Sequence, residues 1–371
     1  MNRRDFISEK GILKKYTGKE TEISIPDEFK KLGGYSFANH AQISRITLSE
    51  RLTEIGAFAF RGCEGLKEIF IPRNVAKIEN GAFADCRALQ AVTVAKDHPV
   101  YYVKQNCLME IATKKLIFGC RNSVIPEEAS EIAPYAFAGC KGLTRAVIPE
   151  GVSAIGECAF ARCSGLLSAA LPETVRSIGR SAFEGCLRLD GIQLPSGIKK
   201  IEESTFSLCA KLSRIHIPEG VEKIGYAAFA FCKSLKEVHI PESVCEIGEL
   251  SFSHCRSLSY LILPKRISYI GQLGDGLPLI GVSLVLPALR EQVRLQAAVG
   301  YAIAVSRKLA SYSDGFRKLH VFEIQQSKDK LLALNEANGE ILSVLQKEKP
   351  VTVEELHAFL FPEEPPIDGV V

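Results

Sequence analysis

Proline recurs every 23 residues through most of this chain. The prolines that keep this step are Pro126, Pro149, Pro172, Pro195, Pro218, Pro241 and Pro264. Earlier, Pro26, Ser49 and Pro72 keep the same step, with a serine at one of the three positions. Apolar residues recur in register with them in the pattern IPxxVxxIGxxAFxxCxxLxxVxIP. This fixed period predicts a solenoid, because no single coil can bury its apolar face alone and neighbouring coils must stack.

The pattern divides each coil into a strand and a turn. In LKEVHIP (235–241), Val238 and Ile240 share one face of a strand, whereas Glu237 and His239 share the other. The remaining apolar positions are three and four residues apart, which indicates a turn of helix with corners that point to a common interior. We therefore expect an α/β repeat solenoid, a right-handed horseshoe-like array with one parallel sheet along its concave face. One phenylalanine per coil should stack inside it: Phe37, Phe60, Phe83, Phe137, Phe160, Phe183, Phe206, Phe229 and Phe252.

The repeated unit resembles the BspA-type leucine-rich repeat of bacterial proteins over roughly residues 20–270. The resemblance implies a solenoid used for protein binding or adhesion, often on cell surfaces, with no shared active site. This chain differs from the surface members because its first twenty residues hold no apolar stretch typical of a secretion signal. No eighteen apolar residues run together, so no membrane insertion is expected. We expect a cytoplasmic protein, or a cell-surface or secreted one if an upstream signal is missing.

The period divides the chain into three regions. We expect an N-terminal cap over residues 1–24, the solenoid over 25–276 and a small α-helical cap or domain over 277–371. In the last region, 286–310 and 327–348 have the pattern of amphipathic helices. They would either cover the exposed apolar edge of the last coil or form a second binding module.

The 23-residue period is interrupted once inside the array. Between Ala95, where a proline is due, and Pro126 lie 31 residues rather than 23. The segment 95–126 has short apolar runs on either side of a polar ATKK turn, which indicates a variant coil rich in β-hairpin. It is either a structural insertion or a loop that contacts a partner.

Eight of the twelve cysteines share one repeat position: Cys63, Cys86, Cys140, Cys163, Cys186, Cys209, Cys232 and Cys255. Cysteine packs well inside coils, so we predict reduced, buried thiols at this position. A ladder of disulfides is the alternative, but stacked coils hold equivalent Cβ atoms farther apart than the ~3.8 Å that a disulfide needs. Cysteines outside the register are expected to be more accessible: Cys107, Cys120, Cys158 and Cys245.

No pattern of a catalytic or cofactor-binding site is present. The chain contains no Walker A loop, no H-E-x-x-H and no G-x-S-x-G, and no cofactor is expected. It also contains no C-x-x-C, and His216 and His239, stacked one coil apart, have no obvious third ligand, so no metal site is predicted. The net charge of +3 and the lack of a run rich in Lys and Arg argue against a nucleic-acid partner. We therefore do not expect this protein to be an enzyme.

Positions that vary between repeats are free to set specificity, because the recurring ones are occupied in packing. The outward strand positions are small in the middle of the array and larger, charged and aromatic towards its C-terminal end. Since interfaces favour aromatic and arginine anchors, we predict these partner-binding residues: Glu68, Phe70, Arg145, Arg214, His216, Glu237, His239, Tyr260 and Ile262. The tail is an alternative partner for the last two.

The expected function is therefore a non-enzymatic scaffold that binds a protein or peptide on the concave, variable face. The alternative is a cell-surface or secreted adhesin that binds a host or matrix protein. A monomer is favoured, although the sequence does not fix the oligomeric state.

Overall fold

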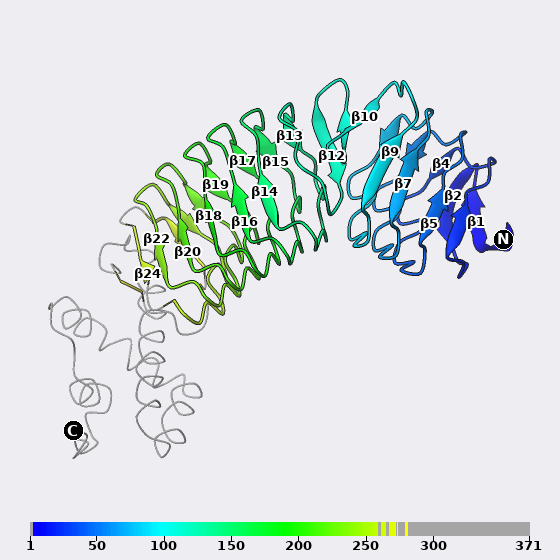
Figure 1. Ribbon diagram of the computed structural model, residues 1–371. Coiled ribbons are helices and arrows are strands. Elements are labelled where there is room, and N and C mark those ends of the chain that lie inside the picture. The colour runs from blue at the N-terminus through cyan, green and yellow to red at the C-terminus, as the bar shows by residue number, and fades with distance from the viewer. Residues whose placement is uncertain (1–2, 259–260, 265–266, 272, 274–278, 281–371) are drawn as a thin grey trace, which may run out of the picture.

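The computed structural model describes residues 3–258, 261–264, 267–271, 273 and 279–280. In this part of the chain the backbone winds into a β-solenoid of about eleven coils of about 23 residues each. The coils follow one another along a curved array (Figure 1). Apart from the short strand β26 (Leu279–Ile280), the expected helical domain over 277–371 lies outside the described residues.

Each regular coil contributes two strands, of which the first has three or four residues in every coil except that of β24. These first strands form the strand face, our name for the surface built by β3 (Glu22–Ser24), β5 (Arg45–Thr47), β7 (Glu68–Ile71), β9 (Ala91–Val94), β14 (Arg145–Val147), β16 (Ser168–Ala170), β18 (Gly191–Gln193), β20 (Arg214–His216), β22 (Glu237–His239) and β24 (Leu261–Ile262). Paired strands are parallel and hold residues 23 apart side by side, as the repeat predicted; His216, for example, lies opposite His239.

Two-residue strands build a second set of parallel ladders that the sequence analysis did not predict. They are β4 (Lys31–Leu32), β6 (Glu54–Ile55), β8 (Lys77–Ile78), β13 (Glu131–Ile132), β15 (Ala154–Ile155), β17 (Ser177–Ile178), β19 (Lys200–Ile201), β21 (Lys223–Ile224), β23 (Glu246–Ile247) and β25 (Tyr269–Ile270). At the N-terminus, β1 (Phe6–Glu9) and β2 (Ile12–Tyr16) form an antiparallel pair, and β2 continues into this ladder through β4. Buried Phe6 and Tyr16 close the first coil.

The expected turn of helix is wrong. The described residues contain a single 3-10 helix (Arg3–Asp5) and no α-helix, and the A-F-x-x-C segments form successive tight turns. The Phe160 N–H donates to the Ala182 carbonyl of the next coil at 2.8 Å, whereas the Cys163 N–H donates to Phe160 in its own coil at 3.2 Å. Because every second N–H bonds to the neighbouring coil, the backbone cannot form the i→i−4 bonds of an α-helix. The fold is therefore a β-solenoid rather than an α/β array.

The predicted aromatic spine is confirmed. Successive rings from Phe137 to Phe252 stack with centroids 5.2 to 5.7 Å apart. Phe37, Phe60 and Phe83 form a second stack with spacings of 5.3 Å. Offset and stacked rings at such distances add to the free energy gained by burial.

The repeated cysteines do more than fill space. The Cys186 Sγ–H donates to the buried Phe160 carbonyl of the preceding coil at 3.3 Å, and the same bond to the preceding phenylalanine recurs at Cys63, Cys86, Cys163, Cys209, Cys232 and Cys255. Each of these carbonyls also accepts a backbone N–H from its own coil, and the thiol supplies a second donor that alanine or valine could not. Burial raises the pKa of Cys209 to about 12, which keeps this donor proton in place.

All twelve cysteines are free, and eleven of them are buried. The expected accessibility of Cys107, Cys120 and Cys158 is therefore wrong; only Cys245 is half-buried. The first two lie on or next to the strands of the variant coil that pack between the two parts of the core.

The segment between Ala95 and Pro126 forms an antiparallel meander instead of a regular coil. Its strands are β10 (Tyr101–Lys104), β11 (Cys107–Glu110) and β12 (Lys115–Gly119), and β12 pairs in parallel with β13. Leu108 and Phe118 join the core of the N-terminal coils, whereas Met109 and Leu116 join the core of the C-terminal coils. The meander thus separates two hydrophobic cores and packs one face against each.

On the side of the array formed by the A-F-x-x-C turns, which we call the turn side, no residues are inserted. The coils before and after the meander contact each other directly there. The Asp85 N–H donates to the Ala138 carbonyl at 2.8 Å. The Arg162 guanidinium donates to both carboxylate oxygens of Asp85, at 3.0 and 2.8 Å. The Phe58 ring meets Tyr135 edge-on, with centroids 4.9 Å apart. We call the Asp85–Arg162 pair the clasp.

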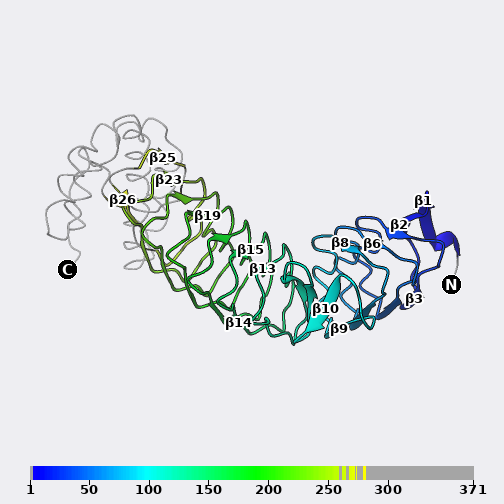
Figure 2. The same cartoon turned by 90° about the horizontal axis from the view of Figure 1, so that it is seen from above.

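Extra strands on one side and direct closure on the other produce a bend. In Figure 1, β10 and β12 lie on the outer side of the arch. Figure 2 shows β9, β10 and β14 on the outer side of the bend and β8, β13 and β15 on the inner side. The expectation that the longer strands line the concave side is therefore wrong, because the insertion at the meander widens the array beside them.

Candidate partner-binding face

Along the strand face, outward and inward residues alternate. In β5 and β20 the first and third residues are exposed and the middle one is buried. The inward residues, such as Ile46 and Ile215, belong to the core. The outward residues are free to differ between coils, so this face carries what distinguishes one coil from the next.

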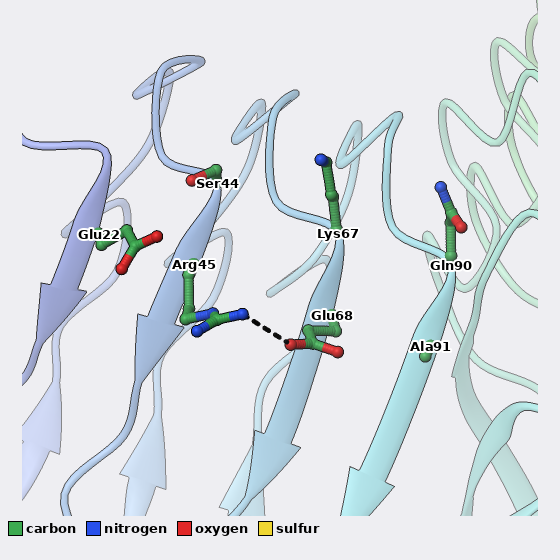
Figure 3. A pocket seen from close by; sticks show the side chains of 7 residues that line it. All are labelled: Glu22, Ser44, Arg45, Lys67, Glu68, Gln90 and Ala91. Carbon is green, nitrogen blue, oxygen red and sulfur yellow. Dashed lines mark ion pairs between the residues drawn. The ribbon is translucent and has the colours of Figure 1, made fainter.

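A hollow of about 370 Å³ lies on the N-terminal part of this face (Figure 3). Its lining residues come from consecutive coils and are almost all polar: Glu22, Ser44, Arg45, Lys67, Glu68, Gln90 and Ala91. They form two rows, one on the strands and one at the residues that precede the strands.

Charges of both signs lie within a few ångströms in this hollow. Arg45 and Glu68 form an ion pair at 3.8 Å that is well exposed to water. In the described part of the chain no ion pair engages Lys67 or Glu22. An ion pair this exposed contributes little free energy, so charged or amide groups of a partner can replace it at low cost. The hollow therefore suits the polar side chains and main chain of a peptide.

The variant coil borders the hollow. The Asn106 amide nitrogen donates to the Gln90 carbonyl at 2.6 Å, and the Val92 N–H donates to the Asn106 side-chain oxygen at 3.2 Å. The Asn106 side chain thus occupies backbone groups at this edge of β9 that a neighbouring strand would otherwise pair with. The strand face is thus interrupted between β9 and β14, where the meander passes.

Apolar side chains continue the face beyond the hollow. Phe70 follows Glu68 by two residues on β7, and its side chain is 45% exposed. Val147 on β14 and Val124, which lies 23 residues before it, are also exposed. A phenylalanine and two valines left in water on one face have no packing role there, so they favour contact with another molecule.

The structure places the predicted site residues in three groups. Glu68 lines the hollow and Phe70 follows it two residues later on β7, whereas Arg145 is exposed on β14. Four exposed side chains come together on β20 and β22, where Arg214 lies opposite Glu237 and His216 opposite His239. Tyr260 lies outside the described residues, and of Ile262 only the backbone, in β24, is described.

Sequence reasoning missed most of the hollow: Glu22, Ser44, Arg45, Lys67 and Gln90 were not among the predicted residues. Alternation along the strands identifies Arg45 as outward-facing. It does not identify Ser44, Lys67 or Gln90, because they precede the strands and recur with the 23-residue step alone.

The described residues contain no group of three or more His, Cys, Asp or Glu side chains that could hold a metal ion. They contain no helix long and apolar enough to cross a membrane.

The fold and its variable outward surface define a repeat solenoid of the leucine-rich-repeat class, whose members are generally non-enzymatic scaffolds that bind proteins. The model of the BspA type leucine rich repeat region (6 copies) matches residues 14–131, 130–258 and 201–273. The chain belongs to this family. A search of the curated proteins found no match.

Solved structures agree with this fold. The chain is similar to a leucine-rich repeat protein from Eubacterium ventriosum, with a TM-score of 0.57 and 20% identity over 71% of this chain and 87% of that one. It is also similar to the pneumococcal vaccine antigen PcpA, with a TM-score of 0.50 and 19% identity over 68% of this chain and 57% of that one. At these identities the likeness shows the fold alone.

Proposed function

We propose that the protein is a non-enzymatic scaffold that binds an extended segment of a partner protein along its strand face. The observation that carries the proposal is the polar hollow around Arg45, Lys67 and Glu68, with the exposed Phe70 directly beside it. Interfaces combine an apolar centre with a polar rim, and these two elements lie side by side here.

The segment would begin at the hollow and run across the coils towards β14. Charged and amide groups of the partner would contact Lys67 and Glu68, and an apolar side chain would cover Phe70. The second predicted group, on β20 and β22, would contact a more distant part of the same partner. Arg214, His216, Glu237 and His239 supply donors and acceptors there, with both signs of charge.

Capture of partners from a lysate of the source cell, followed by mass spectrometry, tests this proposal. The full chain is compared with two variants, R45E/K67E/F70S at the hollow and R214A/H216A/E237A/H239A on β20 and β22. The control is K199E/K200E, which makes the same charge change as the first variant on exposed lysines of another surface, at and beside β19.

We expect a defined set of proteins to bind the native chain and the control and to be lost from the hollow variant. Circular dichroism establishes that each variant is folded. Equal retention by all four proteins would contradict the proposal, and loss from the second variant alone would move the site to β20 and β22.

A further inference from the structure

The tight turns on the other side of the coils carry a feature that the strand face does not explain. In each coil, the residue two positions after the repeated phenylalanine has a left-handed backbone. Gly62, Gly139 and Gly185 occupy this position in three coils, with φ of 72°, 78° and 71°. A residue with a Cβ costs about 1–2 kcal/mol in the same backbone, and the polar residues Asn39, Asp85 and Arg162 hold the position in three other coils.

Two neighbouring coils have large apolar residues there instead. Leu208 and Phe231 both have φ of 62°. Their side chains are 40% and 37% exposed, so burial offsets only part of the cost. Such strain is found where the side chain has a function that glycine cannot supply.

The next coil extends this surface. His254 holds the same left-handed position, and its ring stacks on Phe231 with centroids 4.4 Å apart. On the preceding coil, the exposed Leu187 lies in the same turn, since its N–H donates to the Gly185 carbonyl at 2.9 Å. Leu187, Leu208, Phe231 and His254 thus place exposed apolar or aromatic side chains on the turns of four successive coils, a row that we call the turn ridge.

Positive charge runs along the turn ridge. The Lys233 N–H donates to the Phe231 carbonyl and the Arg256 N–H to the His254 carbonyl, at 2.9 and 3.0 Å, so each cation follows a ridge residue within one turn. Lys211, three residues after Leu208, is also exposed. Residues 207–213, 230–236 and 253–258 contain no Asp or Glu. The corresponding segment one coil earlier, residues 184–190, contains two acids, the half-buried Glu184 and the exposed Asp190.

We propose that the turn ridge is a second docking surface, for an acidic segment of a partner protein that inserts an aromatic or aliphatic side chain. The cations select acidic residues, and Leu208 and Phe231 bind the apolar anchor. This surface is separate from the strand face and does not depend on the function proposed for it.

Peptide binding to the full chain tests the proposal. One pool of fluorescent peptides is built from Asp, Glu, Ser, Phe and Leu, and a matched pool has Lys and Arg in place of the acids. Binding is followed by fluorescence polarisation, and vesicles of phosphatidylserine and phosphatidylcholine serve as a competing anionic probe. Two variants are compared with the native chain. L208G/F231G removes both apolar side chains and introduces glycine, the residue best suited to the left-handed backbone. K211E/K233E reverses the charge of two cations.

We expect the acidic pool to bind and the basic pool not to bind. L208G/F231G should weaken binding at least about tenfold, while Tm stays near that of the native chain because glycine relieves the strain. K211E/K233E should weaken binding at low salt and much less at high salt. The hollow variant R45E/K67E/F70S should bind the acidic pool normally, which separates this test from that of the strand face.

Four results would overturn the proposal. They are the absence of binding, equal binding of both pools, unchanged binding to L208G/F231G, and preferential binding of the anionic vesicles. A fall in Tm of more than about 10 °C in L208G/F231G would also overturn it, because it would show that the two side chains serve packing.

Discussion

The clasp should determine whether the two hydrophobic cores unfold together. Asp85 is 12% exposed, and its carboxylate accepts two hydrogen bonds from Arg162, which lies 77 residues further along the chain. Asp85→Asn keeps the shape of the side chain and tolerates the left-handed backbone at this residue (φ 60°). It removes the charge that makes both bonds strong.

The size of the effect follows from the geometry. A hydrogen bond to a charged group contributes about 1.5–3 kcal/mol when buried. The Arg162 side chain is 40% exposed, so water screens the pair, and we expect D85N to lower the free energy of unfolding by about 1–2 kcal/mol in total. Because the clasp joins the turns on either side of the meander, its loss should also broaden or split the transition.

Urea denaturation followed by circular dichroism gives both quantities. A cycle of D85N, R162K and the double variant isolates the pair, for which we expect a coupling of about 1 kcal/mol. A coupling below about 0.3 kcal/mol, together with an unchanged sharp transition, would show that the clasp does not join the two cores.

The pH dependence gives an independent check. Burial alone would raise the pKa of Asp85, but the hydrogen bonds and charges of Arg162 and Arg61 outweigh it and hold this pKa below its ordinary value. The clasp therefore stabilises the fold above the unfolded pKa of about 3.9, and this contribution is lost as the pH falls through the lower folded value. The difference between the native chain and D85N should shrink below about pH 4.

Two further changes test the packing of the coils. Cys186→Ala should lower the free energy of unfolding by about 1–2 kcal/mol in urea denaturation, because it removes one of the two donors to the Phe160 carbonyl, which keeps the Cys163 N–H, and leaves a small cavity. Cys186→Ser keeps a donor and should cost less; equal losses would contradict the role given to the thiol. Gly119→Ala should lower the free energy of unfolding by about 1–3 kcal/mol, since a Cβ there would lie 2.1 Å from Cε1 of Phe137. The control Gly191→Ala, with nothing within 4 Å of its Cβ, should leave Tm unchanged. A similar Tm for both variants would count against this packing.

The sequence revealed the coils, their register and the buried phenylalanines, because these follow from a local pattern repeated many times. The turns were misread as helical because spacings of three and four residues occur in both structures, while the bonds that decide between them, such as Phe160 to Ala182, reach into the next coil. The bend depends on contacts such as Asp85 with Arg162, for which no local pattern exists.

The candidate site was also predictable only in part from the sequence. Alternation identified Glu68 and Phe70 as outward-facing, and both are exposed. The hollow beside them needs Lys67 and Gln90, which lie outside the alternating positions. The cytoplasmic location, the helical tail and the role of Tyr260 stay predictions.

The repeated thiols have a consequence for how the dynamics of the array can be measured. A thiol reacts with a maleimide as its thiolate, and the burial that raises the pKa of these cysteines also shields the sulfur from reagents. Labelling must therefore wait until the coil that holds a given cysteine opens. Since peptide mapping tells Cys63 from Cys255, the labelling rates would give a profile of local opening along the chain. The native sequence thus contains its own set of kinetic reporters, with a resolution of one coil.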